Sequence, residues 1–470
     1  MSKIKELKEE PYSLKKAASY SIGQIINNAS YQTFSLLVFT FYFTIVGLNV
    51  ILITIAFMIW SVWNSINDPL LGSLSDKTHT KWGRRYPYIM ISIVPLAIVM
   101  FLLFTPPVSL GIKDQIPNFI YFLIIIMVFE FFYSMFDVNL IALFPELFIT
   151  EEERTSANAV RMTVYLITLI ITFGLPTIFI PDFSNPKYLT QYHIFGIFIA
   201  ALIILAGVCF LKFSPKEKAE FRDEYKNIQS FKETFKICVK NKTFMRYLPA
   251  EMGMWYVIGV TTTIIVLYGK FVLGIGEGET IYIALMLAIG FISTAIFMNV
   301  LWKPVVRKIG TRKSWMISVF IWILVISPFM FIQDRFQGII VLFFFGIGLS
   351  GPIYIIDLIL SDIIDEDEVN TGTRREAGYY GVKAFFYKLS TVFVFLTIGL
   401  VFTNIGWAVY EPEKVTSEVI FGLRALMFIF PAIALVISLL VMYIYPLHGE
   451  KLAIVKQKLQ KIHEEKRSRL

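Results

Sequence analysis

The sequence predicts an all-α membrane protein with twelve transmembrane helices in two six-helix bundles. Of its 470 residues, 56% are hydrophobic and only 17% are charged, whereas a soluble domain carries about 25% charged residues. The mean hydropathy is +0.66. A helix needs about 20 apolar residues to cross ~30 Å of hydrocarbon, and twelve stretches of the chain meet this requirement.

The expected helices follow from the apolar runs taken in order. No Asp, Glu, Lys or Arg occurs from Ala17 to Asn67. This run is long enough for two spans that separate near Gly47, so it predicts helices over 17–46 and 49–73. The later apolar runs between polar loops predict ten more helices, over 87–107, 117–144, 155–181, 190–213, 244–272, 280–302, 313–333, 338–361, 378–404 and 419–446.

A long polar stretch in the middle of the chain predicts the domain organisation. It begins "SPKEKAEFRDEYKN" and separates six expected helices from six others. The loops "GSLSDKTHTKWGRRYPYIM" and "WKPVVRKIGTRKSWMIS" lie at equivalent places in the two halves, as is typical of the internal repeats of secondary transporters. The expected segments are an N-terminal cytoplasmic segment (1–16), a first bundle (17–213), a cytoplasmic linker (214–243), a second bundle (244–447) and a basic tail (448–470).

The distribution of Lys and Arg predicts the orientation of the chain. The two termini and the loops on their side of the membrane hold 34 of the 43 basic residues. We therefore expect a multi-pass protein of the plasma membrane with both termini in the cytoplasm. The formal net charge of +8 follows from this bias, so we expect the lipid bilayer and no nucleic acid as a partner. The basic tail either contacts anionic lipid headgroups or forms a solvated helix.

Two acids inside expected spans predict a cation site. A charge at the depth of the bilayer costs ~2.5–3.5 kcal/mol on insertion scales. Asn64 and Asp68 are four residues apart and share a helix face, while Asn67 adds an oxygen on an adjoining face. Such oxygens suit Na⁺, and a carboxylate alone suits a proton, so we expect Asp68, Asp137, Asn64 and Asn67 to bind the cation. The alternative is an ion-pair network that only holds the helices together.

Further polar residues in the spans predict a substrate site. Asn28, Tyr31 and Gln32 form a polar stripe on the first helix, which either lines a wet cavity or bonds to neighbouring helices. Amides and a tyrosine bind neutral hydroxyl groups well, which is compatible with a sugar. Arg161 and Lys388 are cations that offset the acids, and with Asp137 they complete the expected substrate set. Other charges inside spans are Lys383, Glu130, Glu251 and Asp357.

Charged residues in the loops on the side of the termini are candidate gating residues. The loops read "DKTHTKWGRR", "ELFITEEERTS" and "DIIDEDEVNTGTRRE". The acidic loop of the second half would pair with basic loops of the first half when the inner side closes, and otherwise these loops are simply solvated. The candidate gating residues are Asp76, Arg84, Arg85, Arg154, Arg374 and Arg375.

The sequence contains no signature of an enzyme. There is no GxxxxGK[ST] phosphate-binding loop, and the spacings of metal ligands and catalytic nucleophiles are absent. We expect no enzymatic activity and no resident cofactor; the only expected ion is a coupling Na⁺ or H⁺. We also expect no disulfide between Cys209 and Cys238.

Three motifs together resemble the glycoside–pentoside–hexuronide:cation symporters of the major facilitator superfamily. They are "WNSINDPLLGSLSDKTHTKWGRRYPYI", "ALFPELFITEEERTSANAVRM" and "SDIIDEDEVNTGTRREAGYYG". The resemblance implies a central sugar site and symport with Na⁺, Li⁺ or H⁺. It places Asp68, with Asn67 beside it, on the helix-2 cation-site aspartate, and Asp137 on the helix-4 aspartate. Arg161 and Lys388 fall on the helix-5 arginine and the helix-11 lysine.

Three positions depart from the pattern of that family. Asn64 and Asn28 stand where the family has a cation-site aspartate and a sugar-binding aspartate, and Ile141 stands where it has an aromatic residue. The missing carboxylate implies weaker Na⁺ binding and favours proton coupling or uncoupled movement.

The function predicted from these observations is cation-coupled symport of a sugar or glycoside by alternating access. The alternatives are a carrier of a lysolipid or organic anion, and a non-transporting membrane sensor on the same fold.

Overall fold

The computed structural model describes residues 13–78, 80, 82–106, 115–148, 150–215 and 231–468, and its regular elements are helices. The first half contains α1 (Leu14–Ser21), α2 (Gly23–Thr40), α3 (Val50–Asp76), α4 (Tyr86–Leu103), α5 (Gln115–Leu147), α6 (Glu151–Phe179) and α7 (Leu189–Phe213). The second half contains α8 (Phe231–Lys240), α9 (Lys242–Phe271), α10 (Ile281–Phe297), α11 (Lys303–Ile309), α12 (Thr311–Ile326), α13 (Arg335–Thr371), α14 (Glu376–Asn404), α15 (Ser417–Met427), α16 (Ile429–Tyr443) and α17 (Gly449–Ser468).

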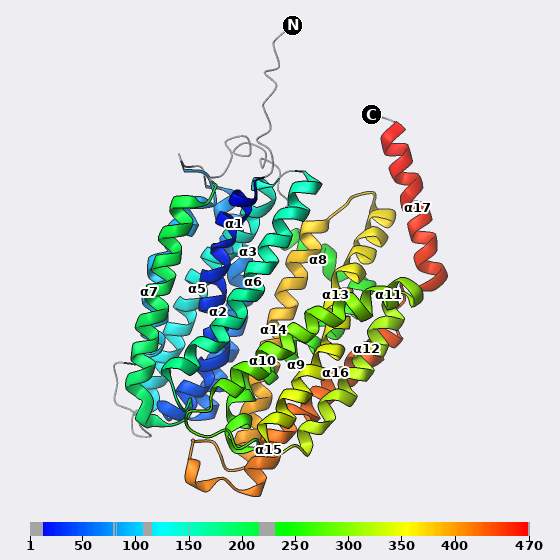
Figure 1. The fold of residues 1–470 in the computed structure, drawn as a ribbon. Helices are drawn as coiled ribbons and strands as arrows, with labels where there is room; N and C mark the ends of the chain where they lie inside the picture. Colours follow the sequence, from blue (N-terminus) through cyan, green and yellow to red (C-terminus); the bar gives the residue numbers. More distant parts are fainter. Residues whose placement is uncertain are drawn as a thin grey trace.

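These helices form two six-helix bundles with twelve crossings, so the predicted fold class is confirmed (Figure 1). Ten of the described helical segments are long and apolar enough to span a membrane, and Tyr86–Leu102 is a shorter apolar helix. The first crossing is made by α1 and α2, which continue into a π-helical turn, η1 (Phe41–Ile45). A second π-helical turn, η5 (Met298–Trp302), joins α10 to α11.

The expectation of an acidic loop after residue 361 is wrong, because α13 continues to Thr371. Its acidic end is helical and largely buried, since basic side chains compensate its charges. Arg374 lies 2.9 Å from Asp365, and Lys451 of α17 lies 2.7 Å from Glu366. The helix then stops at Gly372, whose φ of 73° gives the left-handed conformation that favours glycine.

The tail helix α17 packs against α13 through ion pairs of its lysines and a polar contact of its histidine. Lys456 lies 2.6 Å from Asp362, and His463 lies 3.2 Å from Glu368. The tail is therefore held by the protein's own acidic helix end. In the predicted linker, the structure describes α8; residues 216–230, like residues 1–12 of the predicted N-terminal segment, lie outside the described residues.

Glycines allow the helices of the second half to approach closely. A Cβ on Gly348 of α13 would lie 2.5 Å from Cα of Trp322 on α12. A Cβ on Gly346 would lie 2.6 Å from the backbone nitrogen of Thr294 on α10. Small residues at such crossings are the usual solution in membranes, where packing rather than the hydrophobic effect drives helix association.

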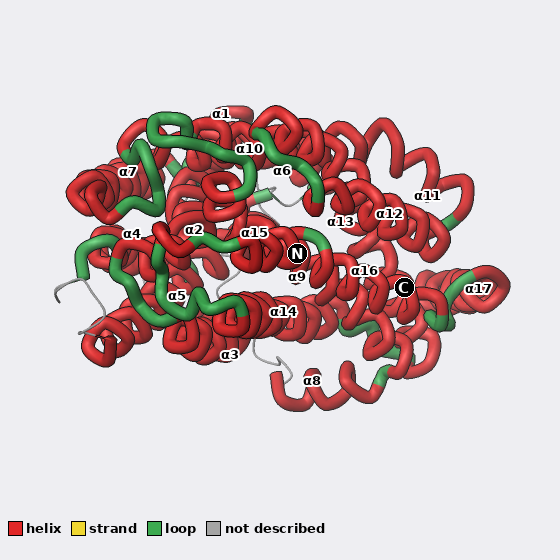
Figure 2. Tube along the Cα trace, turned by 90° about the horizontal axis from the view of Figure 1, so that it is seen from below, coloured by secondary structure: helices red, strands yellow, loops and turns green. Residues whose placement is uncertain are grey.

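The two halves meet along two pairs of helices. Figure 2 shows α3 beside α14 and α6 beside α10. The rings of Phe57 and Phe395 stack at 3.6 Å between α3 and α14, and the Thr54 hydroxyl donates to the Phe395 carbonyl at 3.2 Å. The rings of Phe173 and Phe291 stack at 5.8 Å between α6 and α10.

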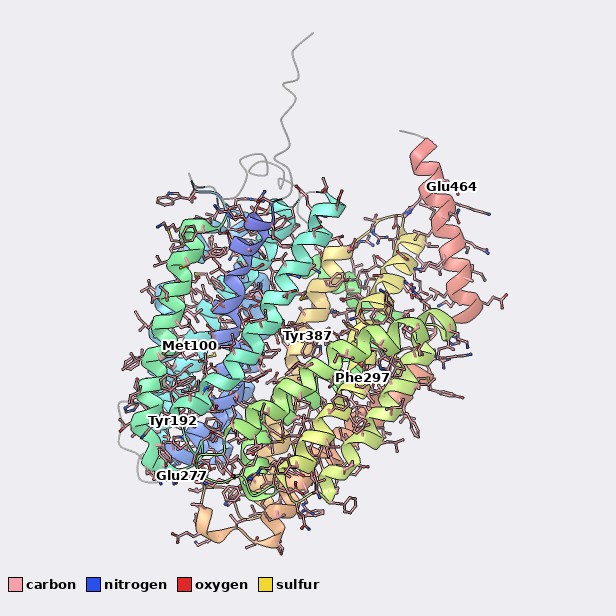
Figure 3. The ribbon with its side chains drawn as sticks, in the orientation of Figure 1. Met100, Tyr192, Glu277, Phe297, Tyr387 and Glu464 are labelled. Atoms are coloured by element: carbon pink, nitrogen blue, oxygen red, sulfur yellow. The ribbon has the colours of Figure 1, made fainter. Side chains whose placement is uncertain are left out.

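Ion pairs join the halves on the side opposite the termini. Lys270 lies 2.8 Å from Asp182, and Lys187 lies 2.6 Å from Glu277, so each pair links one half to the other. The hydrogen bond from Lys187 lowers the pKa of Glu277, which keeps this pair charged at neutral pH. Glu277 is labelled in Figure 3 where the bundles converge.

On the side where α1 begins and α17 lies, called the termini side below, the helices of the two halves diverge (Figure 1). The ion pairs that the described residues form there join residues of one half, such as Arg85 with Asp76 and Arg375 with Asp367. The structure is therefore the state closed on the side opposite the termini.

Replacing Gly348 by Ala is expected to destabilise the second bundle. The new Cβ would overlap with Trp322, and overpacking of this kind costs ~1–3 kcal/mol. The thermal unfolding midpoint of the purified protein should fall. Gly174→Ala is the matched control, because a Cβ at Gly174 meets no atom within 4 Å. Equal midpoints for the two variants would contradict the close crossing of α12 and α13.

Candidate functional site

Lys388 of α14 crosses the interface and contacts two site residues of α3. Its Nζ donates to Asn64 Oδ1 at 2.5 Å and to the Asn64 carbonyl at 3.4 Å. It also forms an ion pair with Asp68. Asn64 and Asp68 share one helix face, as predicted, and the ammonium group occupies the position among their oxygens that the sequence assigned to a cation.

Asp68 is accessible to water although it lies between the halves. Its side chain is 26% exposed. One carboxylate oxygen accepts a hydrogen bond of 2.6 Å from Ser134 of α5, and Ser134 also lies 3.0 Å from Glu130. Asp68 therefore lies between α5 of its own half and α14 of the other half.

Asp137 belongs to the same electrostatic environment but does not contact Lys388 directly. Its carboxylate accepts a hydrogen bond from Asn27 of α2. It interacts electrostatically with Asp68, Lys388 and Arg161. Arg161 itself donates to Asn158 at 2.7 Å and lies 4.7 Å from the centre of the Phe144 ring.

Asn67 and Asn28 point toward neighbouring helices. Asn67 donates to the Glu130 carbonyl at 3.1 Å and is buried. Asn28 donates to the Tyr165 carbonyl at 3.0 Å and to the Thr168 hydroxyl at 2.6 Å. In this state both amides hold α3 and α2 against their neighbours, and neither joins the Asp68–Lys388 cluster.

Aromatic pairs lie in both halves close to the charged cluster. Tyr31 stacks on Tyr133 at 5.2 Å in the first half, and Trp255 stacks on Tyr387 at 5.0 Å in the second. Tyr387 interacts electrostatically with Asp68 and is labelled between the bundles in Figure 3. These four side chains are half-buried, as is Gln32.

The predicted gating residues form contacts within their own halves. Arg84 and Arg85 lie 2.9 and 3.0 Å from Glu146, and Arg154 donates to the Phe148 carbonyl at 2.8 Å. Asp76 pairs with Arg85 at 2.6 Å. In the second half, Arg374 and Arg375 pair with acids at the end of α13. Pairing between the halves on this side stays a prediction for the opposite state.

Sequence reasoning did not select Asn27 or Ser134 for the site. Asn27 belongs to the polar segment of the first helix, but helix periodicity alone did not show that it, and not Asn28, contacts Asp137. Ser134 lies one turn after Glu130 and about one turn before Asp137 on α5, and this i, i+4 spacing was the signal that could have identified it.

Chemically, the oxygens of this cluster can bind either the ammonium group of Lys388 or another positive ion. Carboxylate and amide oxygens suit Na⁺, and the Asp68 carboxylate alone can accept a proton. Among the described residues, three His, Cys, Asp or Glu side chains never converge on one point. The oxygens around Asp68 thus offer a monovalent ion a place only if Lys388 withdraws.

Comparisons with known proteins agree with this architecture. Residues 19–449 match the family model described as MFS/sugar transport protein. The symporter YjmB of Bacillus subtilis, itself uncharacterized, is 25% identical over 458 residues, which cover 96% of each chain. A putative sulfoquinovose importer of Escherichia coli K12 is 24% identical, covering 95% of this chain and 93% of that protein.

One further relative and one solved structure extend the comparison. The sodium-dependent lysophosphatidylcholine symporter 1 of Gallus gallus is 23% identical, covering 88% of this chain and 83% of that protein. The crystal structure of the nucleoside transporter NupG superposes with a TM-score of 0.67 at 14% identity, covering 92% of this chain and 99% of that one, which shows the shared fold. The chain therefore belongs to the MFS/sugar transport protein family and is a membrane transporter of the major facilitator type.

Proposed function

We propose that this transporter is a cation-coupled symporter of a sugar or glycoside that works by alternating access. The observation that carries the proposal is the contact of Lys388 with Asn64 and Asp68 across the interface between the halves. A single positive charge from one half thereby neutralises an acid of the other half. A coupling ion that neutralises Asp68 in place of Lys388 weakens this contact between the halves.

The arrangement of the halves supports alternating access. They are joined by ion pairs on the side opposite the termini and diverge on the termini side. The excess of Lys and Arg on the termini side supports a cytoplasmic position of that side in the plasma membrane. The structure is then the inward-facing state, and rocking of one bundle against the other would expose the site to the outside.

Coupling arises because Lys388 and the coupling ion compete for the carboxylate of Asp68. In the inward-facing state the Lys388–Asp68 pair holds α14 against α3. A proton on Asp68 removes the charge that Lys388 binds, so the contact weakens and Lys388 becomes available to the substrate. Two ligands linked in this way have a coupling free energy of typically ~1–3 kcal/mol.

A proton fits the cluster better than Na⁺. Na⁺ binding requires several oxygen ligands, and here one carboxylate and one amide are already occupied by Lys388. Asn67, the other expected ligand, is bonded to the Glu130 carbonyl. A proton needs only Asp68, so we propose H⁺ as the coupling ion. Transport that depends on Na⁺ and not on the pH gradient would show that Na⁺ is the coupling ion instead.

The polar and aromatic groups between the halves suit a sugar. Small-molecule sites combine aromatic surfaces with a few placed polar groups, and Tyr31, Tyr133, Trp255 and Tyr387 supply such surfaces from both halves. Gln32 is half-buried beside Tyr31 on α2. Asp137, Lys388 and Arg161 supply charged partners for hydroxyl groups or for an acidic sugar.

A lysolipid is the second candidate cargo. It is favoured by the similarity to the lysophosphatidylcholine symporter over most of both chains. Arg161 and Lys388 would then face the headgroup phosphate. Binding assays on the purified protein with a panel of neutral sugars, uronates and lysolipids separate the two cargoes.

Asp68→Asn is expected to uncouple transport from the proton gradient. In proteoliposomes, the wild-type protein should accumulate substrate against its gradient when the pH gradient is imposed, with an apparent affinity that varies ~5–150-fold with pH. The variant should only equilibrate the substrate, since its amide cannot be protonated. Glu413→Gln removes an exposed carboxylate far from the site and serves as the control. Unchanged accumulation by Asp68→Asn, or accumulation that follows Na⁺ alone, would contradict proton coupling at Asp68.

The Lys388–Asp68 pair is expected to appear as an energetic coupling in thermal unfolding. Lys388→Met and Asp68→Asn should each lower the unfolding midpoint, because each leaves a charge without its partner. The loss should be smaller than the ~3–5 kcal/mol typical of a buried pair, since Asp68 is 26% exposed. The double variant should be more stable than the sum of the two effects predicts, by ~0.5–3 kcal/mol. Strict additivity would show that the pair does not hold the halves together.

A further inference from the structure

A second charged cluster lies inside the second half, apart from the Asp68 site. Lys383 of α14 lies between two carboxylates on different helices. Its Nζ is 3.7 Å from Glu251 of α9 and 3.1 Å from Asp357 of α13. One ammonium group therefore faces two acids, and it cannot fully neutralise both.

The two acids differ sharply in their access to water. The Glu251 side chain is 1% exposed, whereas the Asp357 side chain is 62% exposed. Water stabilises the charge of Asp357, but a buried carboxylate is costly unless it is paired and hydrogen-bonded. The shorter contact of Lys383 is made to the acid that needs it less.

Glu251 lacks the hydrogen bonds that would stabilise its charge. Neither of its oxygens has a hydrogen-bond partner in the described part of the chain. Tyr247 and Trp255, one turn away on either side, lie close enough to influence the carboxylate but not in hydrogen-bond geometry, and the Trp255 indole nitrogen is itself without an acceptor. A proton on the carboxylate would remove the uncompensated charge.

We propose that Glu251 is a proton-binding site of the second half whose charge is controlled by Lys383. A hydronium ion entering from the exposed Asp357 side transfers its proton to a Glu251 oxygen and leaves as water. Lys383 then keeps a single ion pair, with Asp357. When the proton leaves, Lys383 is shared between the two carboxylates again.

The groups around Glu251 define what the proton changes. They are Tyr247 on α9 itself, Asp357 on α13, and Lys383 and Tyr387 on α14. Tyr445, after α16, lies near Tyr247. Tyr387 interacts electrostatically with Glu251 and also with Asp68 and Asp137. A proton on Glu251 therefore reduces the negative potential around Tyr387, the side chain on which the acids of both sites act.

Infrared spectroscopy of the full-length protein in nanodiscs tests this proposal without any substrate. Protonated carboxylic acids absorb separately from carboxylates, and their band shifts in D₂O. A pH titration of the wild-type protein should show a carboxylic acid band that Glu251→Gln removes. Glu130→Gln is the matched control, because it removes another buried carboxylate in the first half and should leave the Glu251 band in place.

Two variants test the role of Lys383 with opposite expected shifts. Lys383→Met removes the only cation paired with Glu251 among the described residues, so the midpoint of the band should move by ~1–3 pH units to higher pH. Asp357→Asn frees Lys383 for Glu251, so the midpoint should move to lower pH. A carboxylic acid absorption that loses no component in Glu251→Gln, or equal midpoints of the Glu251 component in the two Lys383 and Asp357 variants, would overturn the proposal.

Because the assay needs no transported substrate, its failure would leave the proposed symport at Asp68 untouched. Conversely, the titration of Glu251 would stand even if the cargo were a lysolipid.

Discussion

The interaction on which the rest of the site depends is the ion pair between Lys388 and Asp68. It joins α14 to α3, the helices that pack side by side along the interface between the bundles. An unpaired charge at this depth is expensive, so each residue makes the other tolerable within the membrane. Asn64 is a second partner of the same ammonium group. The pair therefore links the two halves at the level where we propose that the substrate binds.

The ion pairs at the two ends of the helices differ in whether they join the halves. On the side opposite the termini, Lys270 and Lys187 form ion pairs with acids of the other half. On the termini side, Arg85 and Arg375 pair within their own halves. In the proposed alternating-access cycle, a change of state exchanges these two sets of contacts, and the charged residues between them respond to the coupling ion. Asp68 and Glu251 are the two proposed proton-binding residues, one in each half.

The sequence predicted the helices, and the charges within them, because both leave strong signals. Apolar runs define spans, and Asp68, Asp137 and Lys388 stand out within them. What the sequence could not define is the rotation of each helix. Asn27 and Asn28 differ by about 100° around α2, and only the packing against α5 and α6 decides which one meets Asp137.

Two other differences between the predictions and the structure also result from tertiary contacts. Asn67 looked like a cation ligand beside Asp68, but the approach of α5 gives its amide a backbone carbonyl to bind. The acidic segment after residue 361 looked like a loop because of its charge. It is helical because Arg374 and the lysines of α17, distant in sequence, compensate that charge.

The most direct test of the central claim is a distance measurement across the termini side. Spin labels are attached at Lys77→Cys and Thr373→Cys in a background without Cys209 and Cys238. Double electron–electron resonance spectroscopy then measures the distance between the two labels, and so the separation of the halves. If protonation of Asp68 releases Lys388, the wild-type distribution should shift toward shorter distances as pH falls. Asp68→Asn should show the acid distribution at every pH. An identical pH dependence in both proteins would show that the Lys388–Asp68 pair does not control the state of the transporter.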